Sequence, residues 1–182
     1  MSASAVALLY VFMGLAFVDG VVLHLWVFKL HQRAESRLEH GLHTARTFLM
    51  VPVIGLLFGA PSAGALLWCG TLAAALDLSL GCWDAFIERS SRARWGGLGR
   101  WESALHVALS VLHGAAVALI LASRPLEAWS WSAGPWLEGA PHDAGLLRVA
   151  VPATAALGVL HLVVLLPPFQ RPAGEGAARA DQ

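Results

Sequence analysis

The segment FVDGVVLHLWVFKLHQRAESRLEHGLHTAR, Phe17–Arg46, begins as an apolar run and then carries many side chains of the types that bind metals. Those side chains are Asp19, His24, His31, Glu35, Glu39, His40 and His43. A spanning helix needs roughly 20 mostly apolar residues to cross about 30 Å of hydrocarbon. The apolar residues from Ala5 to Leu30 therefore predict a membrane helix, and the polar residues on it need an explanation.

The composition of the whole chain supports a membrane protein. The chain has 182 residues, of which 57% are hydrophobic and 13% charged, and its mean hydropathy is +0.64. An average soluble domain has about 25% charged residues. The formal net charge is zero and no basic patch alternates with aromatic residues, so we expect a lipid bilayer and no nucleic acid as partner.

The apolar runs predict an all-α integral membrane protein with five transmembrane helices. We expect these helices at about residues 5–33, 38–60, 62–88, 102–122 and 146–167. They form one domain, residues 1–170, followed by a disordered cytoplasmic tail, residues 171–182. The first run is too long for a cleaved signal peptide and lacks a basic leader, so we expect it to be retained.

Basic residues predict the orientation, because they gather on the cytoplasmic side of a membrane protein. They flank the first and third connections as Lys29, Arg33, Arg37, Arg46, Arg89, Arg92, Arg94 and Arg100. We therefore expect a multi-pass protein of a bacterial inner membrane with its N-terminus outside and its C-terminus in the cytoplasm.

Four of the expected helices share one spacing of ionisable residues, with steps of four and then seven. Read inward from the cytoplasmic end, the sets are Glu35, His31, His24; Glu39, His43, Met50; Glu88, Asp84, Asp77; and Glu102, His106, His113. In an α-helix these offsets rotate the side chains by only about 40° and 20°, so each set lies on one stripe. The pattern predicts four helices in an antiparallel bundle around a polar metal-type site, with the glutamates outermost and His24, Asp77 and His113 deepest.

Charged groups in a bilayer favour this metal hypothesis, since each costs about 2.5 to 3.5 kcal/mol at the centre of a membrane helix. The candidate ligands are His24, His31, Glu35, His43, Asp77, Asp84, Glu88, Glu102, His106 and His113. Mixed imidazole and carboxylate donors suit a divalent metal, with iron favoured and zinc or copper as alternatives.

The other ionisable residues have simpler interpretations. Glu39 belongs to the pattern SRLE, a capping box, which favours a role at the start of its helix over a role as a metal ligand. His40 points away from the stripe and is assigned to the interface, while for His161 a packing role is favoured over a ligand role. Asp19 stands five residues before His24 and points elsewhere on an α-helix, where it can orient a histidine or hold a neighbouring helix.

The stretch FVDGVVLHLWVFKLH, Phe17–His31, resembles the opening of a family of small bacterial predicted multi-pass membrane proteins of uncharacterised function. The first helix of that family carries Asp-Gly-x-x-x-His and then a further histidine. LEHGLHTARTFLM is similar to its second helix through Glu39 and His43, and LGCWDAFIE to its third through Trp83 and Glu88. The family usually has paired histidines where this chain has His31-Gln32, and it commonly has four helices. The resemblance implies a fold and a choice of ligands but no reaction.

Three functions remain open. The first is a non-haem, di-iron type oxidoreductase acting on a lipid-soluble substrate or oxygen, with a membrane redox enzyme or a quinone as candidate partner. The second is a metal-handling protein for transport, sensing or delivery to a membrane enzyme. The third is a haem b electron carrier with His24 and either His113 or His161 as axial ligands. Phosphate loops, nucleophile elbows and CxxC pairs are absent from the sequence, so catalytic residues are not assigned.

Overall fold

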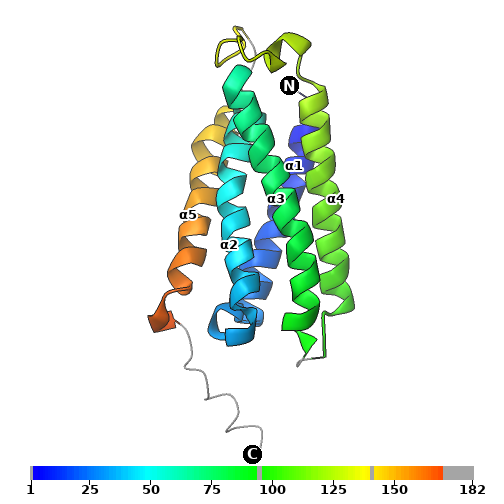
Figure 1. The fold of residues 1–182 in the computed structure, drawn as a ribbon, viewed down its shortest axis with the longest axis vertical. Coiled ribbons are helices and arrows are strands. Elements are labelled where there is room, and N and C mark those ends of the chain that lie inside the picture. The colour runs from blue at the N-terminus through cyan, green and yellow to red at the C-terminus, as the bar shows by residue number, and fades with distance from the viewer. Residues whose placement is uncertain (1, 94–95, 140–141, 170–182) are drawn as a thin grey trace, which may run out of the picture.

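The structure, a computed structural model, describes residues 2–93, 96–139 and 142–169, and these form an elongated all-helical bundle (Figure 1). Five of its helices are long and apolar enough to cross a membrane. The predicted all-helical class and the five apolar spans are thus confirmed. The predicted tail, residues 171–182, and Arg94 lie outside the described residues.

Each span is built from α-helix, and three of them also contain π-helical turns. The spans comprise α1 (Ala3–Phe17) with η1 (Val18–Val27); α2 (Arg37–Pro52) with η4 (Val53–Gly59); α3 (Gly64–Ser91); α4 (Arg100–Ala122); and η7 (Leu146–Ala150) with α5 (Val151–Val164). Short 3-10 turns, η2 (Leu30–Gln32) and η3 (Ala34–Ser36), join η1 to α2. Successive spans run in opposite directions (Figure 1).

Each span packs mainly on one or two of the others. Helix α1 packs mainly on α4, and α2 packs on both α3 and α5. We call the half of the bundle next to the α1–α2 and α3–α4 connections the site half, and the half next to the α2–α3 connection the far half. The far half also holds the segment between α4 and α5 (Figure 1).

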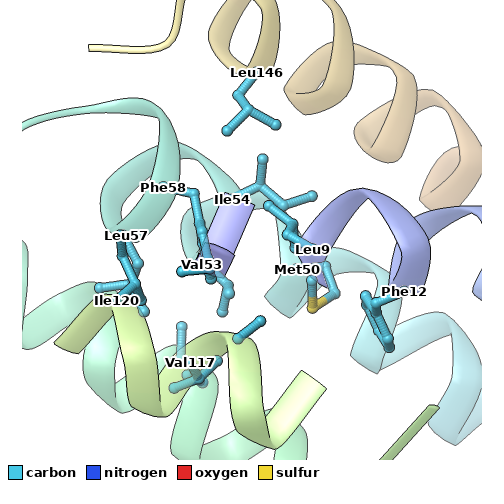
Figure 2. Close-up of a cluster of buried hydrophobic side chains, with 14 of the residues drawn as sticks. Leu9, Phe12, Met50, Val53, Ile54, Leu57, Phe58, Val117, Ile120 and Leu146 are labelled. Atoms are coloured by element: carbon cyan, nitrogen blue, oxygen red, sulfur yellow. The ribbon is translucent and has the colours of Figure 1, made fainter. Parts of the chain in front are cut away.

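The far half has an apolar core. The residues that meet there are Leu9 and Phe12 of α1, Val53, Ile54, Leu57 and Phe58 of η4, and Val117 and Ile120 of α4 (Figure 2). Ile54, Leu57 and Phe58 are at most 1% exposed. Because lipid tails are as apolar as these side chains, close van der Waals packing holds the helices together in this half.

The first span ends earlier than its apolar pattern predicts. It was expected to reach residue 33, but η1 ends at Val27 and Lys29 adopts a left-handed conformation with φ 49°. A non-glycine residue in that region cannot continue a right-handed helix. As a result His31 lies in η2 and Glu35 in η3, outside the span that carries His24.

Candidate metal centre

Ionisable side chains from four spans gather inside the site half. They are Asp19 and His24 of η1; Glu39, His43 and Arg46 of α2; Asp77, Asp84 and Glu88 of α3; Arg92, which follows α3; and Glu102, His106 and His113 of α4. Most are buried, and His43, Arg46 and His106 are partly exposed. Buried charges of this kind require partners or a bound ion.

Two groups within this cluster have the spacing of metal ligands. The first group is His24, Glu39, His43 and Glu88, and the second is His24, Glu88, Glu102 and His106. In each group one potential ligand atom per residue lies within 4.8 Å of the others. Imidazole nitrogens and carboxylate oxygens bind metals at about 2.0–2.2 Å, so donors on opposite sides of one ion stand about 4 Å apart. His24 and Glu88 belong to both groups.

The π-helix η1 explains how Asp19 and His24 come together. Its backbone bonds join residues five apart, so side chains at that interval share a face. Asp19 Oδ1 therefore lies 3.6 Å from His24 Nε2. The expectation that these two residues point in different directions assumed an α-helix and is wrong.

Within the described cluster, His24 stands out because both of its ring nitrogens lack a hydrogen-bond partner. Its side chain is fully buried, and neither ring nitrogen has a hydrogen-bond partner among the described residues. The oxygens of Asp19 and Glu102 nearest to Nε2 are 3.6 Å and 3.7 Å away, and the ring meets that of His43 edge-on at 4.3 Å between centroids. An imidazole in this state needs a further partner, and a metal ion would provide it.

His106 lies between two carboxylates. Its Nδ1 is 3.0 Å from Glu88 Oε2, and its Nε2 is 3.0 Å from Asp19 Oδ1. A carboxylate on the outer nitrogen of a histidine fixes the orientation of the ring. Asp19 is thus placed to orient His106, one of the two roles that the sequence allowed for it.

Arg92 and Ser91 hold Glu39. The Arg92 guanidinium donates to Glu39 Oε1 at 2.7 Å and lies 2.9 Å from Glu102 Oε1, while the Ser91 hydroxyl donates to Glu39 Oε2. Burial opposes the charge on Arg92, but the bond to Glu39 and the charges of Glu39 and Glu102 raise its pKa. The guanidinium therefore stays protonated.

The capping-box interpretation of Glu39 is wrong. Among the residues that the structure describes, the Ser36 side chain caps no backbone N–H group, and Glu39 is fully buried. The sequence did contain the competing signal, since Glu39 stands four residues before His43. Arg92 was interpreted only as a topology signal, and nothing in its spacing indicated a contact with the cluster.

A chain of ion pairs continues from the ligand groups into the bundle. Asp84 Oδ2 lies 3.0 Å from His43 Nε2 and 3.7 Å from Arg46 Nη1. Arg46 Nε is 3.2 Å from Asp77 Oδ1, and Asp77 Oδ2 is 3.0 Å from His113 Nδ1. Asp77, Asp84 and His113 were predicted as ligands, but the structure places them beyond the two ligand groups.

The depth of His24 also differs from the prediction. It was expected in the deepest layer with Asp77 and His113, yet its ring meets those of His43 and His106, with centroids 4.3 Å and 5.8 Å away. The π-helical turns of η1 shift its register. Glu35, expected in the outer layer of the site, and His31, expected in the middle layer, belong to neither ligand group.

Two further histidines form a separate buried pair. His40 Nε2 donates to the backbone oxygen of His161 at 3.2 Å, and their rings stack at 5.1 Å. His40 is fully buried, so its expected place at the interface is wrong.

Comparisons with protein families, curated proteins and solved structures found no match to this chain. The resemblance of Phe17–His31 to a family of small membrane proteins stays a prediction. The function is therefore argued from the geometry of the cluster.

Proposed function

We propose that the protein is a membrane-embedded metalloprotein that holds two divalent metal ions between η1, α2, α3 and α4. The observation that carries the proposal is the pair of ligand groups that share His24 and Glu88. A carboxylate common to two sites can bridge two ions, as in helical bundles that hold di-metal centres. His43 and Glu39 would complete the ligands of one ion, and His106 and Glu102 those of the other.

The charge of the cluster supports two divalent ions. Six buried carboxylates, those of Asp19, Glu39, Asp77, Asp84, Glu88 and Glu102, face two guanidinium groups, those of Arg46 and Arg92. The excess of four negative charges is unfavourable inside a bilayer. Two divalent cations balance it. Four protonated histidines would balance it too, but they would leave the buried N–H groups of His24 without acceptors at hydrogen-bond distance.

The donor set favours iron. It consists of imidazoles and carboxylates, while Cys69 and Cys82 are exposed and take no part in the described cluster. Such ligation suits redox-active iron, and thiolate ligands would have favoured copper(I) or zinc. We assign the protein as a non-haem, di-iron type oxidoreductase acting on oxygen or a lipid-soluble substrate, with the site half at the cytoplasmic face of a bacterial inner membrane.

The alternatives receive less support. The far half is closed by side chains such as Leu57 and Phe58, which argues against a route for ions through the bundle (Figure 2). A metal that stays in place fits this arrangement better than one in transit. Haem ligation by His24 and His113 would not explain why the carboxylates of Asp19 and Glu102 lie next to His24.

The test is the metal content of protein purified in mild detergent without an affinity metal column. Wild-type protein is expected to hold about two iron atoms per chain and to show no Soret band. Glu88→Gln should lose most of both ions, whereas Glu127→Gln, in the exposed segment after α4, should keep them. Folded protein without metal would refute the proposal, and a Soret band would replace it with haem.

A further inference from the structure

A cavity of about 700 Å³ adjoins the candidate metal centre. It is lined by residues of all five spans, and three members of the two ligand groups, His43, Glu88 and His106, reach its wall. Cavities of roughly 300–1,000 Å³ are the usual size of sites for small organic ligands. None of the interactions described above explains this space.

The cavity is long and follows the helices. Along α1 and η1 its lining runs from Tyr10 to Gly20, which is about 15 Å at the rise of a helix. On the other side it follows α5 from Ala153 to His161. Its long dimension is thus parallel to the acyl chains of a surrounding bilayer.

The side of the cavity between α1 and α5 faces the lipid. Helix α1 packs mainly on α4 and α5 mainly on α2, so the two helices that flank the cavity pack on different neighbours. Phe17 of α1 and Leu160 of α5 line it and are 54% and 44% exposed. Gly14 also lines it, and a Cβ added there would meet nothing within 4 Å. A lipid-soluble molecule can therefore reach the cavity from within the membrane.

Charges at the inner end limit the head group of such a molecule. Asp19, Asp84 and Glu88 all reach the wall, and the two proposed metal ions only balance the excess negative charge of the cluster, so a carboxylate or phosphate head would add an uncompensated charge inside the bilayer. Arg46 also lines the cavity, but its charge is already compensated by Asp77 and Asp84. An uncharged hydroxyl group has no such penalty and can donate to these carboxylates.

We propose that the cavity binds an uncharged, long-chain lipid with a hydroxyl-bearing head group. The head lies against His43, Glu88 and His106, and the chain lies between α1 and α5. This inference rests on the proposed function and specifies its substrate class: a neutral lipid alcohol or phenol whose hydroxyl group meets the metal centre.

The test uses iron-loaded full-length protein in phosphatidylcholine vesicles and two photoreactive probes. One probe is a long-chain alcohol with a diazirine in the chain, and the other is the matched carboxylic acid. Gly14→Leu and Ala153→Phe each place a larger side chain in the cavity from a different helix. Gly114→Leu is the matched control, because a Cβ there also meets nothing within 4 Å and Gly114 is not among the described residues that line the cavity.

The alcohol is expected to label residues of α1 or α5 along the cavity, about tenfold more than the acid does. Labelling should fall about tenfold in both cavity variants and stay unchanged in Gly114→Leu. Metal content is measured in the same samples. Bound metal with equal labelling in all variants, or equal labelling by both probes, would overturn this inference alone. A wild-type protein without metal would overturn the proposed function and this inference with it.

Discussion

The far half and the site half are built from the same helices but are held together differently. In the far half, apolar side chains such as Ile54 and Phe58 fill the space between helices, and the Arg124 guanidinium donates to the backbone oxygen of Leu57 (Figure 2). In the site half, carboxylates and imidazoles face each other, and His24 and Glu88 have polar atoms without a hydrogen-bond partner among the described residues. The far half is held mainly by apolar packing, whereas the site half has more buried carboxylates than guanidinium groups. We infer that stability and function can be changed separately in this protein.

His24→Ala should have the largest effect, because it removes a residue common to both ligand groups. We expect the variant to lose most of both metal ions while its helical content stays the same. Elemental analysis and far-ultraviolet circular dichroism would measure the two quantities. His142→Ala, in the exposed segment before η7, is the matched control. Retention of two ions by His24→Ala would remove the central role of this histidine.

Ile54→Ala should produce the opposite result. It leaves a cavity in the far half, and substitutions of this type cost about 2–5 kcal/mol of stability. The metal content should not change. Thermal unfolding in detergent with parallel metal analysis would test this, with Leu72→Ala as a control because Leu72 is 61% exposed. Metal loss in Ile54→Ala at a temperature where it remains folded would show that the two halves are not separable.

Asp19→Asn should have an intermediate effect. It keeps the shape of the side chain but removes the charge that orients His106. Loss of such an outer carboxylate typically weakens metal binding by 10- to 100-fold. Competition with a chelator of known affinity would measure the change. An affinity equal to that of the wild type would mean that Asp19 only packs against α4.

His31→Gln should have the smallest effect. His31 was predicted as a ligand, but it lies in η2 and belongs to neither ligand group. We expect unchanged metal content and a change in stability within about 0.5 kcal/mol. The same chelator competition would check it, and a clear loss of metal would restore His31 to the site.

The sequence predicted the spans well because hydropathy and length alone determine them. It also predicted that His43, Glu88, Glu102 and His106 face a common interior, since a regular α-helix carries each of them. The structure places all four in the ligand groups. These successes share one cause, which is the periodicity of an undistorted helix.

The remaining errors arise where the backbone departs from that periodicity. The π-helical turns of η1 bring Asp19 next to His24 and change the depth of His24. The left-handed Lys29 removes His31 and Glu35 from the first span. A hydropathy pattern contains no signal for either feature. Glu39 was missed for another reason. A glutamate at this position fits a local capping box as well as a buried ion pair with Arg92, and the sequence alone does not distinguish the two.

X-ray absorption spectroscopy at the iron edge tests the central claim most directly. A dinuclear centre is expected to give a shell of nitrogen and oxygen donors and a second iron scatterer at about 3.5–4 Å. Glu88→Gln should lose the iron–iron signal. A nitrogen and oxygen shell with no second metal, in protein that holds two iron atoms per chain, would contradict the shared site.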